Sequence, residues 1–211
     1  GDTVDGGAGT DSISMTNDAT VVDGDFTNMS NVETLTTTGT VNLTATLGAQ
    51  ALEAGIVTVT LADDNVTDTV TIGSGYTGTI TVQLDSDTTN ADVINATSSS
   101  ATLIVEADQT EIDTTAATIT GGTGTSDEIK VATANADDTL QLGSTTLVEK
   151  LTTTGVAGTG STLTLTTVDA LVASGKTFTI DVTSLDDDIL TFDGSAELDG
   201  AFTITADGTG A

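Results

Sequence analysis

The sequence predicts an all-β protein built as a parallel β-solenoid, a β-helix or β-roll-like stack of coils, with tandem β-sandwich modules as the alternative. Apolar residues alternate with threonine in short runs, and turn-forming residues separate these runs. Aromatic residues make up only 2% of the chain, too few for a thick core between two sheets. There is no proline, and no Asn-Gly or Asp-Gly pair joins two equal strands as a hairpin. These features favour the solenoid.

Strands are predicted where the alternation has a strict period of two. Such a run buries its aliphatic face and leaves its threonine face in water, and threonine suits a pleated surface. Coils stacked about 4.8 Å apart leave a narrow interior that suits small aliphatic side chains and has little room for rings. Two segments, 49–54 and 169–173, predict single helical turns at corners. The clearest strand-like runs are 57–61, 79–82, 162–165 and 178–182.

The charge of the chain excludes several partners. Its 211 residues carry 32 acidic and 3 basic side chains, for a formal charge of −29. Nucleic acid and anionic membrane surfaces are therefore repelled. No apolar run approaches the roughly 20 residues of a membrane-spanning helix, so we expect no membrane insertion.

The missing residue types exclude most catalytic sites. The only basic residues are Lys130, Lys150 and Lys176, and there is no histidine, cysteine or arginine. Ser-His-Asp and Cys-His nucleophiles, His/Cys zinc sites and arginine phosphate clamps are thereby excluded. We predict that the chain is not an enzyme. Carboxylates remain abundant, and oxygen ligands point to hard cations such as Ca²⁺.

An internal duplication organises the chain. The segment Val-Glu-Thr-Leu-Thr-Thr-Thr-Gly at 32–39 recurs as Val-Glu-Lys-Leu-Thr-Thr-Thr-Gly at 148–155, an offset of 116 residues. The same offset relates Asp11 to Asp127. We therefore predict a first module at 1–120 and a second, shorter module at 121–206. Residues 207–211 predict the start of a further repeat, which would make the chain a piece of a longer protein.

The motif that carries chemistry lies at 6–14, Gly-Gly-Ala-Gly-Thr-Asp-Ser-Ile-Ser. It matches the nonapeptide Gly-Gly-x-Gly-x-Asp-x-U-x, in which U is a large aliphatic residue. It resembles the calcium-binding repeats of RTX proteins, and this resemblance implies that Gly7, Gly9 and Asp11 are calcium ligands. Asp2 would contribute from the preceding turn. An ordinary glycine turn without a metal is the alternative.

A weaker counterpart of the motif begins the second module. It has one extra residue, Ser126, before its aspartate. By the same resemblance, the metal ligands in this copy would come from Gly122, Gly124 and Asp127, which follow Gly121.

Other acidic residues and the single tyrosine have simpler interpretations. Tyr76, between two glycines, is predicted to be a turn residue and not a sugar-stacking platform. The acidic pairs fall at expected strand ends, where they are either solvated turns or further metal ligands. These acidic residues are Asp63, Asp64, Asp85, Asp87, Asp137, Asp138 and 186–188.

The sparse glycine-rich borders and the long threonine-rich stretches together resemble bacterial surface-layer proteins and large exported adhesins of the RTX type. This resemblance implies a secreted, extracellular or cell-surface structural component that is stabilised by calcium and acts by self-association. A stalk or spacer segment of a secreted RTX adhesin is the alternative. The expected partners are neighbouring copies of the chain, with a cell-surface polysaccharide as a second candidate.

Overall fold

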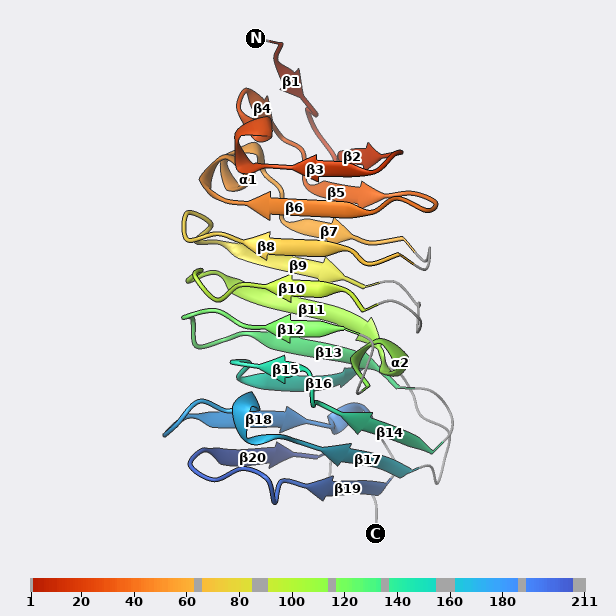
Figure 1. The fold of residues 1–211 in the computed structure, drawn as a ribbon, viewed down its shortest axis with the longest axis vertical. Helices are drawn as coiled ribbons and strands as arrows, with labels where there is room; N and C mark the ends of the chain where they lie inside the picture. The colour runs from red at the N-terminus through yellow and green to blue at the C-terminus, as the bar shows by residue number, and fades with distance from the viewer. Residues whose placement is uncertain are drawn as a thin grey trace.

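The chain folds as a parallel β-solenoid of about seven turns, as the computed structural model shows (Figure 1). The coils stack along the long axis, with the first described strand at one end of the stack and the last described strands at the other. This confirms the predicted fold class. The structure describes residues 2–62, 66–84, 91–113, 117–133, 137–154, 162–185 and 189–206.

A nine-stranded parallel sheet forms one face of the solenoid over its whole length. The distance in sequence between paired residues of neighbouring strands gives the length of one coil. It is 22 residues between Ser12 and Thr34 and 29 residues between Lys150 and Thr179. The sheet passes through the predicted module boundary at residue 120 without a break, and the module bounds themselves stay a prediction. The strands, in order, are β2 (Ser12–Met15), β5 (Thr34–Thr37), β7 (Thr58–Thr60), β9 (Thr79–Gln83), β11 (Thr102–Asp108), β13 (Glu128–Ala132), β16 (Lys150–Thr154), β18 (Thr177–Asp181) and β20 (Ala201–Thr205).

Three smaller sheets complete the coils. Every strand pair among the described residues is parallel, which excludes the sandwich alternative, because sandwiches are built from antiparallel neighbours. A six-stranded sheet contains β15 (Thr145–Thr146), β12 (Thr118–Thr120), β10 (Val93–Asn95), β8 (Thr69–Ile72), β6 (Leu43–Leu47) and β3 (Ala19–Val21). The others pair β1 (Val4–Asp5) with β4 (Met29–Ser30), and β14 (Asp138–Gln141) with β17 (Thr162–Thr166) and β19 (Ile189–Asp193).

The core is a set of aliphatic ladders, one rung per coil. In the nine-stranded sheet one ladder is continuous from β2 to β20, and its seven inner rungs are almost fully buried, whereas the last rung, Ile204, is 44% exposed. Burial of each such side chain contributes about 1.5–3 kcal/mol, so a coil is stabilised by its neighbours on both sides. The rungs are Ile13, Leu35, Val59, Val82, Val105, Ile129, Leu151, Ile180 and Ile204.

The interior holds more aromatic volume than the sequence suggests. Tyr76 follows a turn as predicted, but its ring is fully buried, and its hydroxyl donates to the Ile56 carbonyl oxygen at 2.6 Å. Burial raises the pKa of Tyr76 to about 12. Phe178 is also fully buried, and its ring meets Phe202 edge to face at 6.4 Å. The expectation that rings find little room is therefore wrong both at Tyr76, which follows a turn, and at Phe178, which lies within β18.

Short helical turns occupy the corners. The prediction for 49–54 is confirmed by α1 (Ala49–Ala54), which ends at Gly55 with φ of +106°, a left-handed conformation that favours glycine. The segment 169–173 begins with the 3₁₀ turn η2 (Asp169–Leu171). The remaining turns, which the sequence did not predict, are α2 (Gln109–Ile112), η1 (Asp23–Phe26) and η3 (Thr183–Leu185).

Candidate functional site

The first glycine-rich motif forms the tight connection between β1 and β2. Gly7 and Gly9 have φ of +90° and +126°, which side chains rarely adopt, so glycine is required here by conformation. Asp11 closes the turn just before β2, and its Oδ2 is buried without a hydrogen-bond partner among the described residues. An orphaned carboxylate oxygen next to a glycine turn is compatible with a cation site. The ligand roles predicted for these residues stay a prediction.

The ligand role predicted for Asp2 stays a prediction. Asp2 is exposed and precedes β1, which pairs with β4 and not with the nine-stranded sheet. Asp5 bonds directly to the turn: its Oδ1 accepts the Gly7 N–H at 3.1 Å and the Asn31 side-chain amide at 2.7 Å. The hydrogen bond from Asn31, which has the larger effect, and that from Gly7 hold the pKa of the Asp5 carboxyl below its ordinary value. The sequence analysis missed Asp5, although it stands directly before the glycine pair.

In the second motif the equivalent carboxylate is already satisfied by the protein. Asp127 is fully buried, and its two oxygens accept the N–H groups of Leu103, at 2.8 Å, and Gly122, at 2.6 Å. These two backbone donors leave neither carboxylate oxygen of Asp127 without a hydrogen-bond partner. Each oxygen accepts one N–H group and keeps a second lone pair, and the metal role predicted for Gly122, Gly124 and Asp127 remains a prediction.

The two motifs nevertheless share their attachment to the next coil. The N–H of Asp11 donates to Glu33 Oε2 at 2.8 Å, and the N–H of Asp127 donates to Glu149 Oε2 at 2.9 Å. In return, the backbone carbonyl of each aspartate accepts the N–H of that glutamate at 3.0 Å. Glu33 and Glu149 belong to the repeated Val-Glu segments. In each copy, the aspartate of the glycine-rich motif contacts the glutamate of the Val-Glu segment. This contact explains why the motif and the Val-Glu segment recur with the same offset.

Carboxylates also join coils elsewhere. Asp68 Oδ1 accepts the Leu43 N–H at 2.6 Å, and Asp92 Oδ1 accepts the Asp68 N–H at 2.8 Å. Each such bond gives an acceptor to a backbone N–H group that would otherwise lack one.

The interpretation of acidic strand ends as solvated turns is wrong for Asp138, which is 7% exposed at the start of β14. Asp137 is exposed and accepts the Thr162 N–H at 2.9 Å. The other predicted acidic ends, Asp63, Asp64, Asp85, Asp87 and 186–188, lie outside the described residues.

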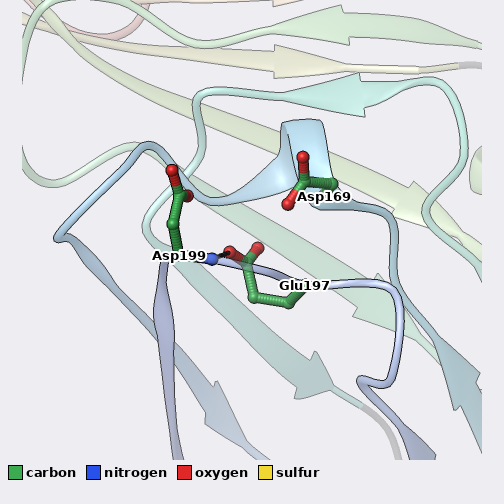
Figure 2. A group of neighbouring side chains, drawn as sticks. All are labelled: Asp169, Glu197 and Asp199. Carbon is green, nitrogen blue, oxygen red and sulfur yellow. Dashed lines mark hydrogen bonds between the residues drawn. The ribbon is translucent and has the colours of Figure 1, made fainter.

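An acidic triad near the end of the stack is the arrangement with the clearest capacity for a metal. Asp169 lies in η2, and Glu197 and Asp199 lie in the turn between β19 and β20, so the three side chains meet from adjacent coils (Figure 2). One carboxylate oxygen from each lies within 4.8 Å of the other two. Asp169 and Asp199 are exposed and Glu197 is half-buried. Three oxygen ligands of this kind can hold a hard cation.

Backbone donors hold the triad in place. Asp169 Oδ1 accepts the Leu198 N–H at 2.9 Å, and Glu197 Oε1 accepts the N–H groups of Asp199, at 3.0 Å, and Gly200, at 2.5 Å. Glu197 Oε2 is buried and has no hydrogen-bond partner in the described part of the chain. The sequence analysis missed this group. The available signal was a spacing of one coil, since Asp169 precedes Glu197 by 28 residues.

No helix in the described ranges is both long enough and apolar enough to span a membrane. Comparison of the chain with models of protein families, with curated protein sequences and with solved structures gave no match. The structure thus establishes the parallel β-solenoid and an acidic triad that could bind a metal, and membership of a family stays a proposal.

Proposed function

We propose that this chain is a structural, calcium-stabilised segment of a secreted bacterial surface-layer or extracellular-matrix protein, and that it acts by self-association with neighbouring copies. The observation that carries the proposal is the uninterrupted nine-stranded sheet, whose parallel strands run through the whole stack. Such a body is stiff along its axis, and many of the outward side chains of its sheet are threonines that stay hydrated. The chain has no histidine, cysteine or arginine with which to build a common catalytic centre.

The calcium part of the proposal is supported by orphaned oxygens. Glu197 Oε2 at the triad and Asp11 Oδ2 at the first glycine turn are buried acceptors without donors among the described residues. A divalent cation would satisfy such an oxygen and relieve repulsion between carboxylates in a chain of net charge −29. Asp169, Glu197 and Asp199 would hold the ion at the triad, and Asp11 would hold one at the turn. Calcium would supply charge neutralisation and cross-linking of adjacent coils.

The alternative is a spacer or stalk segment of a secreted RTX-type adhesin. The elongated, regular stack favours it, because a solenoid separates whatever is attached to its two ends (Figure 1). The two proposals differ in whether the folded chain associates with itself. Both place the protein outside the cell, and both allow a cell-surface polysaccharide as a partner.

Calcium titration with two readouts tests the proposal. The melting temperature and the sedimentation profile of the full chain are measured in millimolar Ca²⁺, in Mg²⁺ at equal ionic strength, and in excess EDTA. At a free Ca²⁺ concentration of about 100 times the dissociation constant, one site adds about 2.7 kcal/mol of stability. We expect Ca²⁺ to raise the melting temperature and to shift the chain toward larger assemblies, and EDTA to reverse both effects.

A charge-removing variant locates the ion. Asp169→Asn with Asp199→Asn should remove much of the calcium response, while Asp25→Asn, an exposed aspartate in η1 outside the triad, should keep it. Stabilisation by Ca²⁺ without assembly would overturn self-association and favour the spacer. Identical melting and sedimentation in Ca²⁺ and EDTA would overturn the calcium proposal.

A further inference from the structure

The outward side chains of the six-stranded sheet form two ranks that run along the axis of the solenoid. The strands of this sheet lie parallel, one above the other (Figure 1). Because neighbouring strands are paired in register, outward residues of one strand lie beside outward residues of the next. The first rank is Thr20, Thr44, Thr69, Val93 and Thr118. The second rank is Thr46, Thr71, Asn95, Thr120 and Thr146. We call these two ranks the threonine face.

The threonine face is a regular lattice of hydroxyl and methyl groups. Its side chains are exposed or partly exposed. Neighbouring strands lie about 4.8 Å apart, and alternate residues along one strand lie about 6.6 Å apart. Thr146 Oγ1 lies 3.4 Å from Thr120 Oγ1, so hydroxyl groups of adjacent coils meet on this face. Threonine is branched at Cβ and has few rotamers, so the lattice is largely fixed before any partner binds.

The threonine face carries no charged side chain, although 17% of the residues in the chain are charged. The outward positions of the nine-stranded sheet differ, because Lys130 pairs there with Glu106 at 3.3 Å and Lys150 with Glu128 at 3.1 Å. A charged partner would find no counter-charge on the threonine face, and an anionic one would be repelled by the net charge of −29. The partner that fits this face is therefore neutral.

The flatness and regularity of the face select the physical class of this partner. A small dissolved ligand is bound in a concave pocket, whereas a flat face of many weak contacts holds a partner that engages many of them at once. The face has no aromatic ring on which a neutral sugar could stack. Its hydroxyl groups donate and accept hydrogen bonds, as water does. Ice is a neutral solid whose oxygen atoms also donate and accept, and they repeat in two directions at spacings close to those of the threonine face.

We propose that the threonine face binds ice, with its hydroxyl groups bonded to water at the crystal surface and its methyl groups lying in the spaces between water molecules. The inference goes beyond the proposed function. It requires neither calcium nor self-association, so it can fail while they hold and hold while they fail.

Slow freezing of a dilute solution of the full chain tests the inference. The fraction of protein that enters the growing ice is measured beside serum albumin, and microscopy of a single ice crystal gives the gap between its melting and freezing temperatures. Thr71→Lys adds a charge and a long side chain to β8, and Thr44→Lys does the same one coil earlier. The matched control Thr58→Lys adds the same side chain to β7 of the nine-stranded sheet. All four proteins are compared in the buffer, with Ca²⁺ or with EDTA, in which circular dichroism shows the folded chain.

We expect the wild type and Thr58→Lys to enter the ice and to lower its freezing temperature below its melting temperature. Folded Thr71→Lys and Thr44→Lys should be excluded from the ice as albumin is, because a lysine side chain separates the face from the crystal and keeps its own hydration. If one of these two variants does not fold, the other decides.

Three results would overturn the inference: exclusion of the wild type from ice, equal entry of the wild type and the folded variants of the threonine face, or an equal loss in Thr58→Lys. If Thr71→Lys changed the sedimentation of the chain but not its entry into ice, the threonine face would be a contact between copies, and ice binding would be wrong.

Discussion

Replacing Asp127 with alanine should strongly destabilise the middle of the solenoid. The aspartate is 0% exposed, and its carboxylate accepts the N–H groups of Leu103 at 2.8 Å and Gly122 at 2.6 Å. Each buried donor left without an acceptor costs about 1–3 kcal/mol, so the two together cost about 2–6 kcal/mol. Against a total stability of about 5–15 kcal/mol for a typical domain, this is a large fraction. Asp127→Asn keeps one acceptor and should fall between the wild type and the alanine variant.

The matched control is Asp11→Ala, 116 residues earlier in the duplication. The Asp11 carboxylate accepts no N–H from the described residues, so its loss breaks no such hydrogen bond and should cost much less than the loss of the Asp127 carboxylate. Urea unfolding followed by circular dichroism gives the stability difference, and hydrogen exchange of β11 and β13 shows where the structure opens. Each measurement is made once in excess EDTA and once in millimolar Ca²⁺.

Two outcomes would refute this reasoning. If Asp127→Ala and Asp11→Ala shifted stability equally, the two N–H bonds would carry no special energy. If Asp127→Ala destabilised only in the presence of Ca²⁺, then Asp127 would be a metal ligand in the folded protein, as the glycine-rich motif by itself implies. A loss that persists in EDTA, with faster exchange confined to the neighbouring coils, supports the hydrogen-bonded carboxylate.

Two further predictions concern the same region. Glu149→Gln should raise the free energy of unfolding at neutral pH, because burial raises the pKa of Glu149 and the folded state therefore disfavours its charge. Urea unfolding should show that this gain shrinks as the pH falls through the raised pKa and vanishes below the ordinary value of 4.5. A loss of stability at neutral pH would contradict the prediction. Gly121→Ala should cost about 1–3 kcal/mol or more, because the new Cβ would lie 1.8 Å from the Leu147 carbonyl oxygen. Gly24→Ala, where a Cβ meets nothing within 4 Å, should stay within about 0.5 kcal/mol, and equal melting of the two variants would refute the steric argument.

The fold could be predicted from the sequence because its cause is local and repeated. Alternation at 79–82 and 178–182 defines which residues face inward, and β9 and β18 follow these patterns closely. A strand that buries small aliphatic residues on one face needs an identical neighbour above and below, and stacking supplies it without a large core. The burial of Tyr76 escaped prediction because it involves a residue 20 positions earlier in the chain, Ile56, whose carbonyl oxygen accepts the tyrosine hydroxyl.

The site could be predicted only in part, because the same residues do different work in different surroundings. Asp11 and Asp127 share a motif and an offset, yet only Asp127 has the Leu103 N–H of a preceding coil within reach. The extra residue Ser126 lengthens the second turn, and in that turn the Gly122 N–H reaches the carboxylate, whereas in the first turn the Gly7 N–H bonds to Asp5. A motif records which groups are present, and the number of residues between them decides which partner they meet.

The acidic side chains therefore have two different roles in the described structure. Inside the stack, carboxylates such as Asp92 and Asp127 accept backbone N–H groups from a neighbouring coil and so join one coil to the next. Near the end of the stack, Asp169 and Glu197 are brought together by one coil of spacing, and the buried Oε2 of Glu197 has no donor in the described part of the chain. Because a solenoid transmits stability only between adjacent coils, a cation at the triad would strengthen β19 and β20 far more than the strands around Asp127. Calcium dependence and resistance to a chelator can thus coexist in one molecule, each in its own coils.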